Sequence, residues 1–220
     1  MTVFAVHDTG GLMRAGSISQ GFAAVVLMLA ILAAPICATA GDGGVFILDK
    51  EHTSVRFSYE HLGMSWQSGS FRDVIGRLAF DPERPEMSEL NVTIKVATVT
   101  TGVPAYDRVL SATNDYLDAA AYPDITFTST AVSVTSAKTA NVTGDLTING
   151  VSRPVTLAVV WNFLGEHPLA KVNPLYQGVN AAGFSARTQI LRSEWGISRG
   201  IPLLSDEIRI SIEAELHRLN

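Results

Sequence analysis

Apolar and polar residues alternate on both sides of an Asn149-Gly150 pair within the segment from Gly144 to Leu157. Asn-Gly between two alternating runs is a strong hairpin signal, because both turn residues must tolerate positive φ. An isolated hairpin is only marginally stable in water, so its apolar face needs a larger sheet to cover it. We therefore predict a β-hairpin here. The side chains expected on its buried face are Leu146, Ile148, Val155 and Leu157.

The same period of two recurs after residue 50 and predicts eight strands. The expected strands are Ser54–His61, Ser68–Phe80, Leu90–Val96, Ile125–Val134, Asn141–Ile148, Val151–Phe163, Ala182–Ile190 and Ile208–Leu216. Gly69 and Gly76 interrupt the second strand, as bulges or sharp bends would, and a further irregularity is expected near Ser129. Short connections without helices favour an antiparallel sheet. The pattern suits a closed barrel or a sandwich.

One stretch, from Val103 to Tyr122, lacks this alternation. Pro104 fits a first helical turn, and the apolar spacing from Ala105 to Asn114 is helical. Asp115–Ala121 is expected to form a second short helical turn. This is the one helical insertion predicted after the leader.

The first forty residues have the pattern of a secretory signal peptide. Arg14 precedes the apolar run Gly21–Ala34, and Ala38–Ala40 supplies the small residues of a cleavage site. We predict a secretory signal peptide over residues 1–40 and one exported domain over residues 41–220. An uncleaved anchor, lipidation at Cys37, and a translation start at Met13 rather than Met1 stay open.

Charge and cysteine content exclude a nucleic-acid partner and a disulfide framework from the expected function and fold. The net charge is −5, the pI is about 5.5 and there is no basic stripe, so no nucleic-acid partner is expected. The single cysteine lies in the leader, so the mature chain has no disulfide framework. The fold must be held by its own core, or by a core together with a ligand.

No motif for catalysis or metal binding stands out. The histidines are scattered, and no paired metal-ligand spacing or nucleophile motif is present. Their positions are His7, His52, His61, His167 and His217. Asp107 is either a helix-surface acid or a polar contact at a barrel mouth. We expect no catalytic residue, no metal site and no enzymatic activity.

The predicted inward face is rich in aromatic residues. It comprises Phe57, Tyr59, Phe71, Phe80, Phe127, Trp161, Phe163 and Phe184. A packed β-core and a ligand tunnel are lined by the same residue types, so periodicity leaves both open.

Several motifs together resemble the YceI-like family over about Val45 to Leu216. The motifs are Ser58–Gly63 with Gly69–Phe71, Tyr122–Ser129, Thr143–Val151, Pro154–Leu157, Gly183–Ala186, Trp195–Ile197 and Asp206-Glu207. The resemblance implies an all-β fold, an elongated eight-stranded antiparallel barrel of the lipocalin-like type with one short helical insertion. It also implies a periplasmic protein that sequesters or carries a long isoprenoid lipid, such as a polyprenyl lipid or the tail of a quinone like ubiquinone.

The chain departs from the family in the helical insertion. Many relatives carry a basic, histidine-containing run there, whereas this chain has Leu110–Tyr116, without basic or histidine side chains. A different or uncharged head group is therefore implied. Arg72 and Arg108 are candidate substitutes, each with an ordinary surface role as the alternative.

The predicted ligand-binding set has two parts. The tunnel lining is Phe57, Tyr59, Phe71, Phe127, Leu146, Trp161 and Phe184. The mouth or head-group end is assigned to His61, Trp66 and Arg108.

No cofactor is expected beyond a bound isoprenoid lipid or quinone. The partners left open are the inner membrane, a membrane cytochrome and a second copy of the chain. The alternatives are a non-enzymatic stress or assembly factor of the respiratory membrane with a self-filled barrel, and an enzyme acting on a lipid or quinone.

Overall fold

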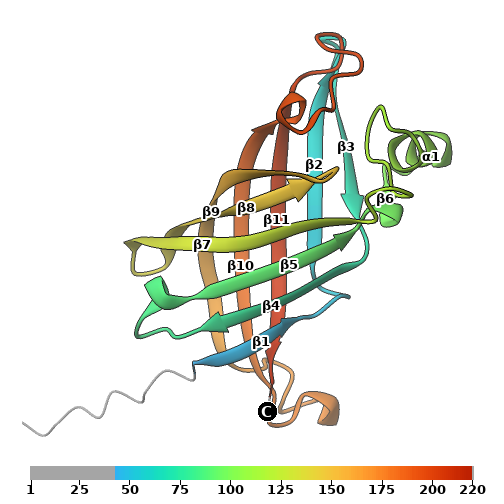
Figure 1. Cartoon of the computed structure of the whole chain (residues 1–220). Coiled ribbons are helices and arrows are strands. Elements are labelled where there is room, and N and C mark those ends of the chain that lie inside the picture. Colours follow the sequence, from blue (N-terminus) through green and yellow to red (C-terminus); the bar gives the residue numbers. More distant parts are fainter. Residues whose placement is uncertain (1–42, 220) are drawn as a thin grey trace, which may run out of the picture. The chain divides into compact units, whose positions relative to one another are not determined.

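The computed structural model describes residues 43–219 (Figure 1). Its strands are β1 Gly44–Leu48, β2 Ser54–His61, β3 Ser65–Phe71, β4 Val74–Phe80, β5 Glu89–Lys95, β6 Val99–Thr100, β7 Asp124–Ser136, β8 Thr139–Ile148, β9 Val151–Glu166, β10 Asn180–Leu191 and β11 Glu207–Arg218. Helix α1 spans Pro104–Ala112, and 3-10 turns occupy Pro85–Met87, Val96–Thr98, Pro174–Tyr176 and Arg192–Trp195. The predicted signal peptide, with Cys37 and the cleavage site after Ala40, lies outside the described residues. No described helix has the length and apolar character needed to span a membrane.

The strands close into an antiparallel barrel. Their order is β1-β4-β5-β7-β8-β9-β10-β11, and β1 pairs with β11 to complete the ring. The upper part of β11 pairs instead with β2, which adds β3 and the short β6 to the same sheet (Figure 1). The all-β, eight-stranded antiparallel barrel with one short helix is thus confirmed, and the sandwich is excluded.

The strand that closes the ring, β1, was missed from the sequence. Its residues Val45, Phe46, Ile47 and Leu48 form a continuous apolar run rather than an alternating one. Phe46 is fully buried and pairs with Leu78 on one side and Arg218 on the other. The outward-facing Val45 and Ile47 are only partly exposed, so both faces of the strand carry apolar residues and the alternation is lost.

The predicted strand Ser68–Phe80 is two strands. The chain breaks at Arg72 and Asp73, whose backbone N–H groups both donate to Thr98 Oγ1, at 3.3 and 3.1 Å. The expected bulges at Gly69 and Gly76 are wrong, because both glycines lie within regularly paired strands. A Cβ at Gly69 would lie 2.4 Å from the Phe57 ring, and one at Gly76 would lie 2.4 Å from Leu48. The glycines therefore make room for large interior side chains.

The Asn149-Gly150 hairpin is confirmed. Ile148 pairs with Val151, and the two turn residues have φ of 49° and 74°, as a type I′ turn requires. The four side chains predicted for the buried face are each less than 10 % exposed. The Asn149 side chain also donates a hydrogen bond to the carbonyl of Tyr116. The turn thereby holds the segment that follows α1.

Helix α1 matches the predicted insertion, with Pro104 in its first turn. The second helical turn predicted for Asp115–Ala121 is reduced to one bond, from the Tyr122 N–H to the Asp118 carbonyl at 2.6 Å, and no helix forms there. The chain becomes extended at Thr113 and folds back on the helix, with N–H···O bonds of 2.9 Å from Leu117 to Leu110 and from Ala119 to Ser111. These bonds use the backbone donors that a second helix would have needed.

Register shifts between paired strands change which side chains face inward. The expected one on β7 is present, as the pairing with β8 shifts between Ser129 and Ala131. A second, unpredicted shift lies between β9 and β10, where Trp161 pairs with Phe184 but Phe163 pairs with Gly183. The extra residue between the two reverses the alternation. Phe163 is therefore 37 % exposed, and its predicted inward orientation is wrong.

Candidate ligand-binding cavity

The barrel encloses a cavity of about 920 Å³. Its walls are the inward side chains of β1, β2, β4, β5 and β7–β11, with contributions from β3 and α1. Most of these side chains are apolar. The volume lies near the top of the range of about 300–1,000 Å³ typical of small-molecule sites. A self-filled barrel would be packed to near-crystalline density with few voids, so this volume argues against it.

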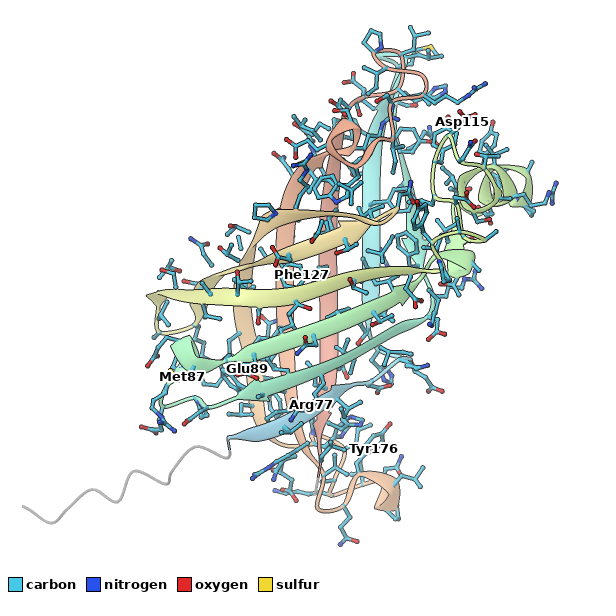
Figure 2. The ribbon with its side chains drawn as sticks, in the orientation of Figure 1. Arg77, Met87, Glu89, Asp115, Phe127 and Tyr176 are labelled. Carbon is cyan, nitrogen blue, oxygen red and sulfur yellow. The ribbon has the colours of Figure 1, made fainter. Side chains whose placement is uncertain are left out.

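Most of the predicted site residues meet in this cavity. Phe57, Tyr59, His61, Phe71, Phe127, Leu146, Trp161 and Phe184 all line it. Figure 2 places Phe127 on β7, midway along the barrel. Contact of these residues with a ligand stays a prediction.

Two predicted residues lie elsewhere. Trp66 is 44 % exposed, and the guanidinium of Arg209 lies over its ring at 3.8 Å from the centroid. Arg108 is exposed on α1. Neither lines the cavity, nor does Arg72, the other candidate substitute. Arg108 lies on the surface of a helix and Trp66 near the start of a strand. At neither position does the sequence pattern predict the direction of the side chain.

Aromatic pairs shape the cavity wall. Phe80 contacts Trp161 and Phe184 edge to face, with ring centroids 5.2 and 5.5 Å apart. Phe57 and Phe71 have centroids 5.8 Å apart. Such pairs add about 0.5–1.5 kcal/mol beyond area burial, and so they hold the rings in place around the empty volume.

The cavity reaches the surface in two places, marked by lining residues that are also exposed. Gln67, Tyr106 and Val109 mark the helix-side mouth, beside β3 and α1. Val134, Ser136, Ala137 and Lys138 mark the hairpin-side mouth, at the β7–β8 turn.

A buried cation lies in the cavity wall. The Arg192 side chain is 7 % exposed, and its guanidinium donates to the carbonyls of Ile197, Arg199, Leu204 and Ser205 at 2.9–3.0 Å. Burial lowers the pKa of Arg192, although an arginine keeps its charge in proteins. The residue was missed because a single arginine in a loop creates no periodic signal.

Among residues 43–219, no carboxylate bonds directly to this cation. Asp206, the acid whose charge acts on it, accepts hydrogen bonds from the backbone N–H and hydroxyl of Ser193 instead. The neighbouring Trp195 is 2 % exposed and donates from Nε1 to the carbonyl of Leu146 at 3.1 Å. The loop that Arg192 organises is thereby fixed to β8 and covers this part of the cavity.

Two tyrosines place further polar groups inside. Tyr59 and Tyr116 line the cavity, and both interact electrostatically with Arg192. Burial raises the pKa of Tyr59, so its hydroxyl is a neutral hydrogen-bond donor at neutral pH. Within residues 43–219 neither hydroxyl has a hydrogen-bond partner. Both are free to bind a polar group of a ligand.

Asp107 does not line the cavity but ties α1 to the barrel. Its carboxylate accepts from Thr101 N and Oγ1 at 2.6 and 2.7 Å, and from Thr100 Oγ1 at 3.1 Å. The Thr101 backbone N–H is the main cause that lowers the pKa of Asp107. The acid therefore has a defined structural role at the start of the helical insertion.

The fold and the cavity define a closed antiparallel β-barrel built around an interior apolar site. The chain belongs to the YceI-like family, whose domain model matches residues 46–216. This confirms the resemblance seen in the motifs.

Three similar proteins illustrate the family and the fold. A UPF0312 protein of Pseudomonas syringae pv. syringae is 37% identical over 182 residues, covering 82% of this chain and 88% of the relative. The crystal structure of a Campylobacter jejuni YCEI protein is 32% identical with a TM-score of 0.64, covering 73% of this chain and 90% of that chain. A polyisoprenoid binding domain from Saccharophagus degradans, implicated in plant cell wall breakdown, has a TM-score of 0.57 at 14% identity, covering 80% of this chain and 99% of that chain. This last likeness is one of fold alone.

Proposed function

We propose that the protein is a non-enzymatic binding protein that sequesters a long isoprenoid lipid inside its barrel. The observation that carries this proposal is the cavity of about 920 Å³ with a mostly apolar lining. The polyisoprenoid-binding neighbour from Saccharophagus degradans supports the choice of ligand class. No cofactor is needed for this function.

Burial of the lipid tail would supply the affinity. Each methylene removed from water contributes about 0.8 kcal/mol, so one five-carbon isoprene unit contributes about 4 kcal/mol before ordering costs. A few units would offset the several kcal/mol lost to immobilisation. Specific polar contacts are therefore needed for orientation and selectivity more than for affinity.

The head group would lie at the end of the cavity formed by Tyr59, Tyr116 and Arg192. These residues offer neutral and charged hydrogen-bond donors within an apolar wall. A quinone carbonyl or a polyprenyl oxygen could accept such bonds. In this proposal Arg192 has the head-group role that was predicted for Arg72 or Arg108.

Native mass spectrometry of the purified protein, followed by lipid extraction, tests the proposal. We expect one isoprenoid lipid per chain, or uptake of one from a panel of polyprenols and quinones. Absence of a bound or bindable lipid across that panel would refute the proposal, whereas retention of fatty acids alone would change the ligand class.

The mature protein would work in the periplasm and exchange its lipid with the inner membrane. Exposed apolar side chains gather at the tip of the β2–β3 hairpin, where Leu62, Met64 and Leu203 are 44, 74 and 63 % exposed. The Leu62 N–H donates to the Leu203 carbonyl at 2.7 Å, so the two segments form one surface, here called the apolar apex. Its hairpin also carries Gln67 of the helix-side mouth, so an apex in contact with a bilayer would bring that mouth close to the lipid.

Matched variants test this exchange. Met64→Asp with Leu203→Asp should slow lipid transfer to acceptor vesicles severalfold, because a charged tip resists insertion into the interface. Val172→Asp with Leu175→Asp is the control, since these side chains are 78 and 84 % exposed in the loop between β9 and β10. Equal transfer rates in the two double variants would contradict an exchange through the apex. They would not contradict the binding of a lipid in the cavity.

A further inference from the structure

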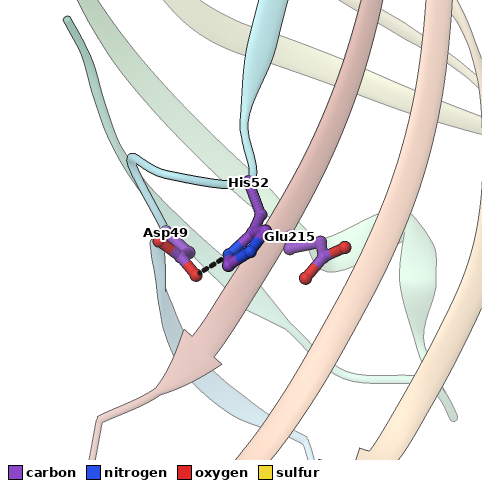
Figure 3. A group of neighbouring side chains, drawn as sticks. All are labelled: Asp49, His52 and Glu215. Atoms are coloured by element: carbon purple, nitrogen blue, oxygen red, sulfur yellow. Dashed lines mark hydrogen bonds and ion pairs between the residues drawn. The ribbon is translucent and has the colours of Figure 1, made fainter.

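Four metal-ligating side chains, far apart in the sequence, meet on the outer face of the barrel. Asp49 and His52 belong to the connection between β1 and β2, and Glu215 and His217 belong to β11. Leu216, between the last two, is buried and lines the cavity, so the alternation of the strand turns Glu215 and His217 outward. Figure 3 shows Asp49, His52 and Glu215 converging from the two elements.

The separations suit ligands of one ion. Donor atoms of Asp49, His52 and Glu215 all lie within 4.8 Å of one another. His217 Nε2 is 3.9 Å from Asp49 Oδ2, and His52 Nδ1 is 2.7 Å from the same oxygen. Two ligands bound at about 2.0–2.2 Å from a single tetrahedral Zn²⁺ lie about 3.4 Å apart. Side-chain rotations must therefore bring the more distant donor atoms closer and move His52 Nδ1 away from Asp49 Oδ2, and His52 is half exposed and able to rotate.

His217 gives the second reason to expect an ion. Its Nε2 is buried and has no hydrogen-bond partner among the described residues. The His217 ring is covered by the rings of His167 and Tyr176, which stack with their centroids 3.8 Å apart. Their centroids lie 5.4 and 6.1 Å from that of the His217 ring. A nitrogen shielded from water and facing a carboxylate too distant for a hydrogen bond is an available metal ligand.

We infer that Asp49, His52, Glu215 and His217 form a binding site for a divalent transition-metal ion, with Zn²⁺ as the best match. Two imidazoles and two carboxylates give the mixed nitrogen and oxygen donors that Zn²⁺ accepts in a tetrahedral set. Ca²⁺ and Mg²⁺ prefer oxygen donors alone. The two carboxylates also give the site a net negative charge that attracts a cation. The site is separate from the lipid cavity and does not depend on the lipid proposal.

Zinc competition against a chromogenic chelator tests the site on the purified protein at neutral pH. We expect one Zn²⁺ per chain, with affinity reduced at least about tenfold in both His52→Ala and Glu215→Gln. Mg²⁺ at the same concentration should not compete. Cobalt(II) should give the absorption bands of a tetrahedral complex in the wild-type protein and lose them in both variants.

Glu213→Gln is the matched control, because Glu213 lies two residues away on the same outward face of β11. It should bind Zn²⁺ like the wild type. If His52→Ala does not fold, the exposed and nearly isosteric Glu215→Gln decides the question alone. Equal zinc affinity in Glu215→Gln and Glu213→Gln, or no zinc bound by the wild type, would overturn the inference.

Discussion

Substituting Ala214 by phenylalanine would fill part of the cavity without disturbing its wall. Ala214 lies on β11, faces the interior and pairs with Phe184, yet it is only partly buried because empty space lies in front of it. The added ring occupies room comparable to one isoprene unit of a bound tail. Losing the burial of five carbons costs up to about 4 kcal/mol, or about three orders of magnitude in Kd.

A flexible tail can partly reroute, so we expect Ala214→Phe to weaken isoprenoid binding by at least about tenfold. The stability of the unliganded protein should stay within about 1 kcal/mol of wild type, because the ring enters a void rather than a packed core. Lipid titration, followed by native mass spectrometry or by displacement of a fluorescent isoprenoid, gives the affinity, and urea denaturation gives the stability.

The control is Ala158→Phe, which adds the same ring to an exposed position on β9 and should leave lipid affinity unchanged. Unaltered affinity in a folded Ala214→Phe protein would refute the reasoning, because it would mean that the tail does not occupy this part of the barrel. An equal loss in both variants would point to a general effect of the added ring.

Three further predictions concern the scaffold. Arg192→Met leaves four loop carbonyls without their donor and should cost about 3 kcal/mol or more, a fall in Tm of roughly 6–12 °C; a melting point within a few degrees of wild type would contradict it. Gly150→Ala adds a Cβ at a residue with φ of 74°, 2.8 Å from the ring of Tyr122, and should lower the free energy of unfolding by about 1–2 kcal/mol in urea denaturation. The loss should exceed that of Gly178→Ala, a position with similar φ but open space around it. Asp107 has a lowered pKa, so its contribution is fully present above the ordinary value of 3.8 and is lost as pH falls through the lower folded value. Asp107→Asn should therefore be less stable than wild type at neutral pH, and this difference should shrink in acid; a difference that does not change with pH would show that the Thr101 contact is not the cause.

Local pattern was enough to predict most of the walls of this barrel. Alternation placed Leu146 and Val155 on the inner face, and Asn149-Gly150 fixed the register of their hairpin. Phe163 escaped the pattern because one extra residue in β9 reverses the alternation, and nothing local marks where the partner strand accommodates it. β1 escaped because its apolar run has no polar face.

The features that depend on distant parts of the chain could not be predicted. Whether inward aromatic residues such as Phe80 and Trp161 meet in a packed core or surround a void depends on barrel closure, and the alternation is the same in both cases. The depth at which Arg192 is buried is set by a loop that wraps back over it. His52 and His217 are separated by most of the domain, so only the pairing of β1 with β11 brings them to one place.

The two mouths of the cavity differ in how strongly they can orient a ligand. Lys138 at the hairpin-side mouth is exposed and lies 5.6 Å from the Trp161 ring, so water and salt screen its charge. Arg192 is buried, and an unscreened charge acts several times more strongly at the same distance, since the effective dielectric constant falls from about 80 to about 20. The hydroxyls of Tyr59 and Tyr116 add donors at that same end. In the proposed function, a lipid oxygen would therefore be drawn toward Arg192, and the isoprenoid tail would extend away from it, toward the β7–β8 hairpin.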